Sequence, residues 1–201
     1  MTAITQATNA TSVHRRAFVA ELISQCTDAL IVTGLGSASY DVFAASDRGR
    51  TFYLWGAMGG AAALGLGLAI AQPECDVLVI TGDGEQLMGL GALATIGVQK
   101  PRNLSIVVLD NGYFGETGMQ RSHTSLGVDL IGVAKACGFE WTLEIDNVGG
   151  AADIAAQVKR RAGCGLARVC VKAEELPRAL PPRDGVYVKN RFRAALGLAP
   201  L

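Results

Sequence analysis

Residues 77–115 read VLVITGDGEQLMGLGALATIGVQKPRNLSIVVLDNGYFG. Apolar residues run continuously through Val77–Thr81 and Ser105–Leu109, which is typical of strands buried on both faces of a sheet. A helix is expected between them, over Gln86–Val98, because this stretch carries good helix formers and no proline. A strand, a helix and a second strand in this order predict two parallel strands joined by a crossover helix.

The same alternation of short apolar runs and helical stretches continues on both sides of this unit. It predicts an α/β fold, an open parallel six-stranded sheet with helices on both faces. The other four strands are expected at Ala29–Thr33, Thr51–Leu54, Trp141–Ile145 and Ala167–Val171. The other helices are expected near Ser12–Asp28 with Ser12 as a cap, and near Ser39–Ala45, Gly59–Ala71, Leu130–Cys137 and Ala151–Ala162.

Three regions are expected along the 201 residues. Residues 1–11 are polar and predict a flexible arm, and residues 12–173 form the α/β domain. From residue 174 the prolines at 177, 181 and 182 break the pattern and predict a tail, with a short helix around Lys189–Leu196.

Composition excludes several classes of function. The 18 basic and 18 acidic residues cancel, so no general field attracts nucleic acid or anionic lipid. The five cysteines form no CxxC pair, which argues against a zinc site, an iron–sulfur cluster and a disulfide framework. The longest apolar run, Gly56–Ala71, is 16 residues and short for a membrane span, and residues 1–16 lack the apolar core of a signal peptide. We expect a soluble, cytoplasmic protein.

Polar side chains follow the two strands of the opening stretch. Gly82-Asp83-Gly84 comes directly after the first strand, and 26 residues separate Gly84 from Asn111, which follows the second. The Asp83 carboxylate and the Asn111 amide oxygen are therefore expected at neighbouring strand ends. With the main-chain carbonyl of Tyr113, two diphosphate oxygens and one water, they would complete an oxygen shell for Mg²⁺. A lone Gly-Asp-Gly is usually an ordinary turn, but an asparagine at this spacing after a second buried strand favours the metal site.

This stretch resembles the Gly-Asp-Gly…Asn motif of thiamine-diphosphate-dependent enzymes. In addition, Trp55-Gly56-Ala57-Met58-Gly59 is similar to a turn of the pyruvate decarboxylase group. The resemblance implies that Met58 supports the cofactor in a bent shape and that the Gly56 carbonyl accepts a hydrogen bond from the aminopyrimidine. Without the flanking match, simple core packing would be the favoured explanation of Met58.

The sequence resembles the sulfopyruvate and phosphonopyruvate decarboxylases most closely. The similar elements are residues 89–96 within MGLGALATIG, Thr117-Gly118-Met119-Gln120, and the turn from Thr33 to Ser37. Glu85 stands where some relatives have a hydroxyl residue, so any contact there is expected through backbone amides. The implied cofactor-binding residues are Ser37, Gly56, Ala57, Met58, Gly82, Asp83, Gly84, Glu85, Asn111, Tyr113, Phe114, Gly115 and Glu116, and the implied magnesium ligands are Asp83, Asn111 and Tyr113.

Two cationic residues follow the predicted cofactor loop. Arg121 and His123 could meet the carboxylate, sulfonate or phosphonate of a substrate, although isolated surface residues would look the same. We predict His123 and Met58 as the catalytic candidates.

Enzymes of this family need a glutamate that activates the aminopyrimidine, carried by a separate pyrimidine-binding domain. None of the eight glutamates here has such a setting, and Glu85 and Glu116 belong to the diphosphate end. The resemblance therefore implies a β-type subunit of a 2-oxo acid decarboxylase, completed by an α-type subunit in an α2β2 assembly or a multiple of it, acting on a small anionic 2-oxo acid. An acetolactate synthase-like carboligase and a non-catalytic cofactor-binding module stay open. The β subunit of a 2-oxoacid:ferredoxin oxidoreductase is disfavoured, because its cysteine cluster is absent.

Overall fold

The computed structural model describes residues 13–201. The predicted arm, residues 1–11, and the predicted cap Ser12 lie outside the described residues. No helix of residues 13–201 is long and apolar enough to cross a membrane.

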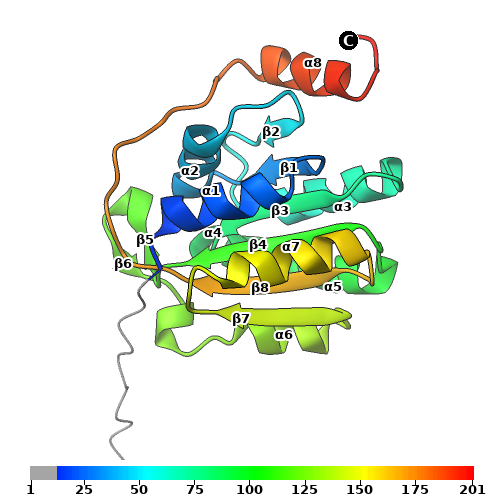
Figure 1. Ribbon diagram of the computed structural model, residues 1–201. Coiled ribbons are helices and arrows are strands. Elements are labelled where there is room, and N and C mark those ends of the chain that lie inside the picture. The colour runs from blue at the N-terminus through cyan, green and yellow to red at the C-terminus, as the bar shows by residue number, and fades with distance from the viewer. Residues whose placement is uncertain (1–12) are drawn as a thin grey trace, which may run out of the picture.

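The core of the fold is a six-stranded sheet in which every neighbouring pair of strands is parallel (Figure 1). The strand order is β2-β1-β3-β4-β8-β7. All six predicted strands are confirmed, with ends that differ by at most two residues. Their bounds are β1 Leu30–Thr33, β2 Thr51–Tyr53, β3 Val77–Gly82, β4 Leu104–Asp110, β7 Trp141–Ile145 and β8 Gly165–Cys170.

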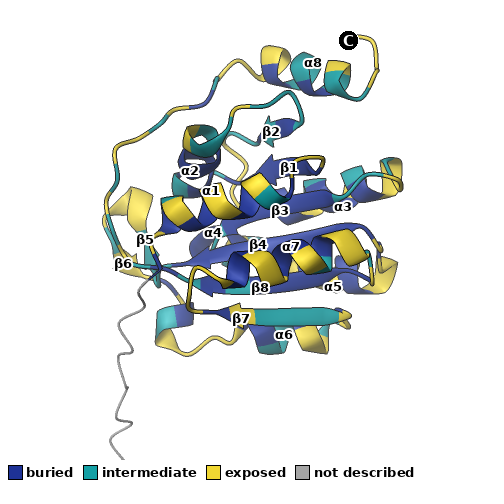
Figure 2. Cartoon of the chain, in the orientation of Figure 1, coloured by how far each residue is buried: buried dark blue, intermediate teal, exposed yellow. Residues whose placement is uncertain are grey.

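Helices cover both faces of this sheet, which confirms the predicted fold class. Each face has its own apolar core: Leu78 and Ile80 of β3 point into one, while Val77 and Val79 point into the other. The central strands are therefore buried on both sides (Figure 2), as their unbroken apolar runs indicate. One face packs α1 (Arg15–Gln25), α2 (Ser37–Ala45) and α7 (Gly150–Arg160), and the other packs α3 (Ala61–Ala71), α5 (Gly91–Gln99) and α6 (Leu130–Ala136).

The prediction of a single helix over Gln86–Val98 was wrong. The structure has α4 (Asp83–Met88) and α5, separated by Gly89 and Leu90. A Cβ atom on Gly89 would lie 2.0 Å from the Gly59 carbonyl oxygen, so the turn that follows Trp55 packs backbone against backbone at this break. The close approach holds that turn against the end of α4.

A small hairpin lies beside the main sheet and was not predicted. Its strands, β5 (Tyr113–Phe114) and β6 (Gln120–Arg121), are antiparallel, and the 3₁₀ turns η1 (Gly115–Thr117) and η2 (Thr124–Leu126) flank β6. Strands of two residues are too short to show an alternating pattern.

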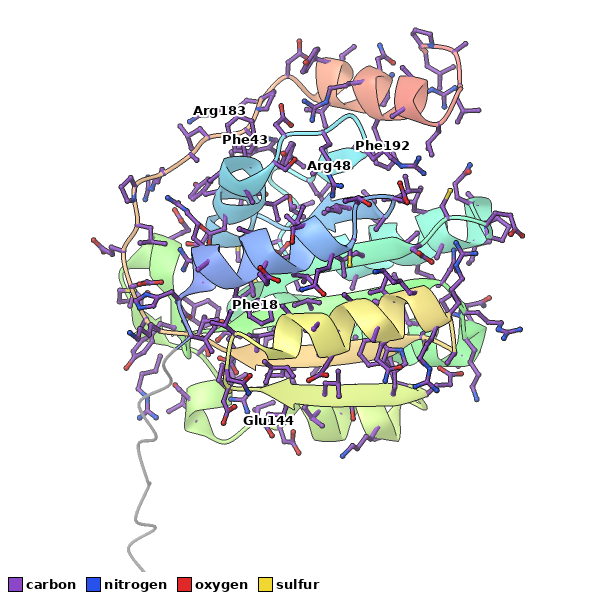
Figure 3. The ribbon with its side chains drawn as sticks, in the orientation of Figure 1. Phe18, Phe43, Arg48, Glu144, Arg183 and Phe192 are labelled. Carbon is purple, nitrogen blue, oxygen red and sulfur yellow. The ribbon has the colours of Figure 1, made fainter. Side chains whose placement is uncertain are left out.

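The C-terminal segment, residues 171–184, runs from the end of β8 across the carboxyl-end edge of the sheet to α8 (Gly185–Ala195). Along this path the Pro177 carbonyl accepts a hydrogen bond from Arg16 at 2.8 Å, and the Pro182 carbonyl accepts one from the Trp55 indole at 2.8 Å. The helix begins at Asp184, whose side chain caps it. Phe192, labelled in Figure 3, then packs edge-on against Phe52 of β2, with ring centroids 5.7 Å apart. The domain boundary at residue 173 stays a prediction.

Candidate functional site

A pocket lies at the carboxyl ends of the central strands. From β1 the chain runs outward to β2, whereas β3 and β4 lie on the other side of β1, so the order reverses between β1 and β3. Ligands of open α/β sheets bind at such reversals. This strand-end pocket is lined by Arg15, Leu35, Ser37, Ala38, Met58, Gly82, Asp83, Gly84, Glu85, Leu109, Asn111, Tyr113, Phe114, Gly115, Glu116 and Thr117.

Most of the predicted site residues come together there. Eleven residues of the predicted cofactor set line the pocket, drawn from four separate parts of the chain. Gly56 and Ala57 do not line it, although their turn presents Met58 to it. His123 does not line it either, and its ring lies edge-on to Phe114 with centroids 6.2 Å apart.

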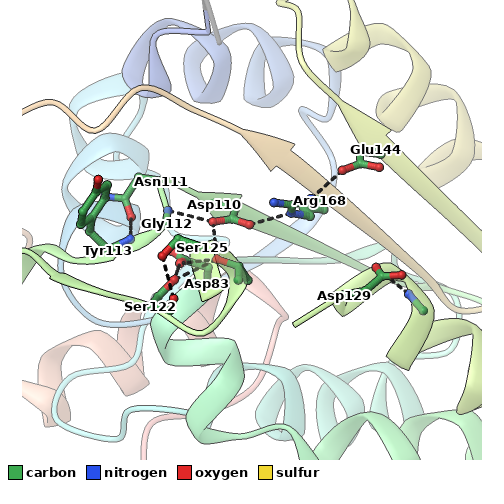
Figure 4. Close-up of polar contacts among 12 residues, drawn as sticks. Asp83, Asp110, Asn111, Gly112, Tyr113, Ser122, Ser125, Asp129, Glu144 and Arg168 are labelled. Carbon is green, nitrogen blue, oxygen red and sulfur yellow. Dashed lines mark hydrogen bonds and ion pairs between the residues drawn. The ribbon is translucent and has the colours of Figure 1, made fainter. Parts of the chain in front are cut away.

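Asp83 is a buried carboxylate close to a second one (Figure 4). It is 2% exposed and accepts hydrogen bonds from the hydroxyls of Ser122 and Thr124, the latter at 3.2 Å. Burial and the nearby charge of Asp110 raise the pKa of Asp83 to about 6, against the opposing effect of the two hydroxyls. A cation in the pocket would relieve this like-charge contact.

Asp110, the second carboxylate, accepts from three hydrogen-bond donors. Its Oδ2 accepts from Arg168 Nε at 2.6 Å, and its Oδ1 accepts from Thr124 Oγ1 and the Gly112 amide, each at 2.9 Å. Arg168 also pairs with Glu144 at 2.5 Å. Asp110 is therefore charge-compensated within the fold, and Asp83 is the member of the pair that lines the pocket.

Asn111 supplies a second side-chain oxygen. Its Oδ1 accepts from the Tyr113 amide at 2.9 Å, which fixes the turn after β4. An amide oxygen has two lone pairs, so this bond leaves it able to accept again.

This set of oxygens fits Mg²⁺. Carboxylate and amide oxygens are the ligands it prefers, with phosphate and water completing its shell. Within residues 13–201 no group of three or more His, Cys, Asp or Glu side chains could hold a metal ion. The site therefore offers the two side chains, Asp83 and Asn111, that the sequence predicts, rather than a complete cage.

Gly84, which lines the pocket, has no room for a side chain. A Cβ atom on Gly84 would lie 2.5 Å from the Phe114 ring, so only glycine fits between Asp83 and Glu85. The Phe114 ring fills the space where a side chain would stand, and the backbone of Gly84 lines the pocket.

Glu85 ties two strand ends together. Its buried Oε2 accepts from Thr81 Oγ1 at 2.8 Å and from the Leu35 amide at 3.1 Å. Burial raises the pKa of Glu85, and these two bonds lower it. A Cβ on Gly34 would collide with this carboxylate, so the Gly34–Leu35 turn closes directly over Glu85. Its carboxylate thus has a role within the fold that the sequence did not reveal.

Comparison with known families agrees with this geometry. Residues 35–179 match the family model described as thiamine pyrophosphate enzyme, C-terminal TPP binding domain. The chain belongs to this family.

Curated relatives of this TPP-binding domain include decarboxylases. The chain is 44% identical over 111 residues to sulfopyruvate decarboxylase subunit beta of Methanocaldococcus jannaschii, which covers 55% of this chain and 58% of that one. It is 38% identical over 174 residues to phosphonopyruvate decarboxylase of Streptomyces viridochromogenes, covering 86% of this chain and 43% of that one. The chain thus spans about half the length of the curated relatives it matches.

Solved structures share the fold of the TPP-binding domain. Benzoylformate decarboxylase from Polynucleobacter necessarius superposes with a TM-score of 0.70 at 17% identity, over 84% of this chain and 35% of that one. A 2-oxoglutarate:ferredoxin oxidoreductase from Magnetococcus marinus superposes with a TM-score of 0.63 at 18% identity, over 94% of this chain and 79% of that one.

Sequence reasoning missed several residues of this site. Ser122 and Thr124 bond Asp83 from the hairpin, and no motif distinguished them from ordinary polar residues. Arg15 and Leu35 line the pocket from distant segments, and no local spacing pointed to Arg15.

Proposed function

We propose that this chain is the diphosphate- and magnesium-binding, β-type half of a thiamine-diphosphate-dependent decarboxylase for a small anionic 2-oxo acid. The observation that carries the proposal is that Asp83 and Asn111 line one pocket beside the bare backbone of Gly84. The relatives named sulfopyruvate decarboxylase and phosphonopyruvate decarboxylase support the substrate class.

The residues divide by their place in the pocket or, for Gly56 and Ala57, in the turn beside it. Asp83, Asn111 and the Tyr113 carbonyl would hold Mg²⁺. Ser37 and the stretches 82–85 and 114–116 would contact the diphosphate, while Gly56, Ala57 and Met58 would support the rings. When bound, thiamine diphosphate supplies the electron sink for loss of carbon dioxide from a 2-oxo acid.

The acid that activates the cofactor would come from a partner. Of the two glutamates that line the pocket, Glu85 is bound to Thr81 and Leu35, and Glu116 pairs with Arg178 at 3.2 Å. A pyrimidine-binding subunit in an α2β2 assembly, or a multiple of it, would complete the site. The relatives named subunit beta support this arrangement. The longer phosphonopyruvate decarboxylase relatives favour the alternative, in which both halves share one polypeptide.

Co-expression with a pyrimidine-domain chain tests this function. The complex is to be screened with sulfopyruvate, phosphonopyruvate and pyruvate for carbon dioxide release and for carbon–carbon bond formation. Release of carbon dioxide with an aldehyde product supports a decarboxylase, and an acetolactate product supports the carboligase. No turnover with a complex that binds the cofactor would favour the non-catalytic module.

Met58 is expected to support the reacting conformation rather than affinity. It is 40% exposed and lines the pocket from the turn after β2, whereas Asp83 follows β3. We expect Met58→Ala to lower turnover by roughly tenfold or more, since small misplacements of reacting groups have large effects, and to change cofactor affinity by less than about threefold. Met88→Ala is the matched control, because Met88 is exposed and does not line the pocket. Equal turnover of Met58→Ala and the wild type would leave Met58 a packing residue.

Arg121 is expected to act on the substrate and not on the cofactor. Its Nε donates to Ser125 Oγ at 3.2 Å and its Nη2 donates to the Ser125 carbonyl, so the exposed guanidinium is held against η2 and does not line the strand-end pocket. We expect Arg121→Ala to raise KM for an anionic 2-oxo acid about tenfold, since a charged hydrogen bond to the substrate is lost, with diphosphate affinity unchanged. Exposed Arg102 gives the control variant Arg102→Ala. An unchanged KM would discard the role of Arg121 in charge recognition.

A further inference from the structure

Two arginines share one buried carboxylate beside the strand-end pocket. Asp41 is fully buried, and its two oxygens accept from Arg15 Nε and from Arg16 Nε, the latter at 2.9 Å. The nearest glutamates are otherwise engaged: Glu116 pairs with Arg178, and Glu174 binds the His14 ring and the Arg15 amide. Asp41 therefore carries one negative charge against two arginines, and two further carboxylates, Glu174 and Glu175, line a second pocket beside Arg15 and not the strand-end pocket.

Arg15 brings this charge to the pocket. Its side chain is 6% exposed, against 31% for Arg16, so it is the more deeply buried of the two guanidiniums. Among the described residues that line the strand-end pocket it is the only cation, and three acidic residues, Asp83, Glu85 and Glu116, line the pocket with it. Arg15 also lines a second pocket between α1, α2 and the C-terminal segment, which shares Ser37 and Asn111 with the first. It thus lies on the boundary between the two.

The start of α2 presents backbone donors at the same place. This nine-residue helix begins after Gly36, which has a φ of 76° and no side chain to cap it. Its first residues, Ser37 and Ala38, line the strand-end pocket. The first amides of a helix have no partner within the helix and bind anions readily. By contrast, α4 has six residues, and its first turn carries Asp83 and Glu85.

The Arg15 guanidinium and the uncapped start of α2 line the same pocket, and both offer N–H donors to an anion. A guanidinium whose Nε is fixed by a carboxylate still offers its terminal N–H groups in a fork that matches phosphate oxygens. Asp41 divides its single charge between Arg15 and Arg16, so an anionic ligand would add a second counter-charge to Arg15.

On the basis of the proposed function, we propose that Arg15 is a diphosphate-binding residue. It holds the diphosphate of the cofactor from the α1–α2 side of the strand-end pocket, together with Ser37 and the first amides of α2, while Asp83 and Asn111 hold it through Mg²⁺. Asp41 is the residue that positions the Arg15 guanidinium.

Calorimetry on the full chain, with its partner subunit where the complex is required, tests the role of Arg15. The probes are thiamine diphosphate, inorganic diphosphate and thiamine, each with Mg²⁺. We expect Arg15→Gln to lower the affinity for both diphosphates by roughly 10- to 100-fold, the effect of one or two charged hydrogen bonds, and to leave thiamine binding unchanged. Arg16→Gln is the matched control, because Arg16 binds the same carboxylate but does not line the strand-end pocket. Its affinities are expected within about threefold of the wild type.

The outcomes separate this proposal from the proposed function. Diphosphate binding that is equal in wild type and Arg15→Gln overturns the role of Arg15 and leaves the proposed function in place. Equal losses of diphosphate affinity in Arg15→Gln and Arg16→Gln would show that the effect passes through Asp41. That result also overturns the role of Arg15. Failure of the wild type to bind thiamine diphosphate overturns the proposed function and this inference with it. Should Arg15→Gln not fold, Arg15→Lys retains the charge beside Asp41, and a loss of roughly three- to tenfold is then expected because the fork is absent.

Discussion

Asp83→Asn is expected to abolish magnesium-dependent binding of thiamine diphosphate. The substitution keeps the shape of the side chain and removes the only carboxylate charge that the predicted ligand set offers to the ion. We expect affinity in the presence of Mg²⁺ to fall by at least about 100-fold, since Mg²⁺ is held through very few protein ligands. Calorimetry of the assembled complex with and without Mg²⁺ measures this. Unchanged affinity would remove the basis of the proposed function.

The same variant is expected to be more stable than the wild type without ligands. The pKa of Asp83 is raised to about 6 in the folded protein, from an ordinary value of 3.8, so the folded state binds a proton more tightly than the unfolded state. Protonated Asp83 therefore contributes to the stability of the folded state at low pH. This contribution is lost as pH rises from about 4 to about 6, and it stays lost at higher pH. The asparagine side chain would remove this penalty, because it is uncharged and its NH₂ group can donate to Asp110. We expect a gain of roughly 1–3 kcal/mol in the free energy of unfolding at about pH 7.5.

Urea denaturation with a chelator present measures the gain. Asp76→Asn is the matched control, because Asp76 pairs with Arg161 at 2.5 Å and a similar loss of charge there should bring no stabilisation. A less stable Asp83→Asn protein would contradict the like-charge contact between Asp83 and Asp110.

The chain without a pyrimidine-binding partner is expected to show no decarboxylase activity. Both glutamates that line the pocket have partners within the chain. Glu85 accepts hydrogen bonds from Thr81 and Leu35, and Glu116 pairs with Arg178. Met58 is 40% exposed, so the end of the pocket where the rings would rest is open to water. A site that stays wet quenches reactive carbon centres and weakens electrostatic stabilisation. Turnover of the lone chain is expected below about one thousandth of that of the complex, since it lacks both the activating acid and a dry site.

Reconstitution is the measurement. Carbon dioxide release from a 2-oxo acid should appear when the partner is added, and a glutamate-to-glutamine change at the partner's activating residue should remove it again. Robust decarboxylation by the purified single chain would show that the activating acid lies within it.

The sheet could be predicted because each strand leaves a pattern in its own short stretch of sequence. Each central strand is an apolar run bounded by glycine or polar turns, and parallel strands buried on both faces leave that mark in the sequence. Asp83 and Asn111 could be predicted for a related reason, because one strand–helix–strand unit fixes their separation. The break at Gly89 was not, since it depends on contact with Gly59, 30 residues earlier.

The rest of the site depends on contacts between distant segments. The Ser122 and Thr124 hydroxyls reach Asp83 only because a hairpin of two-residue strands folds back over it. Arg15 precedes Asp83 by 68 residues and reaches the pocket because α1 packs beside α2. Neither arrangement has a periodic pattern of its own.

The position of α8 has a consequence for how the chain avoids self-association. Strand β2 is at an edge of the sheet, where unpaired backbone groups can template pairing with another chain. Arg191 of α8 donates to the Thr51 carbonyl at 3.4 Å, and Phe192 covers Phe52. The residues that shield this edge follow it by more than 130 positions, so β2 stays open to other strands until a distant part of the chain has docked. Loosening α8 would therefore expose the β2 edge and lead to aggregation through it.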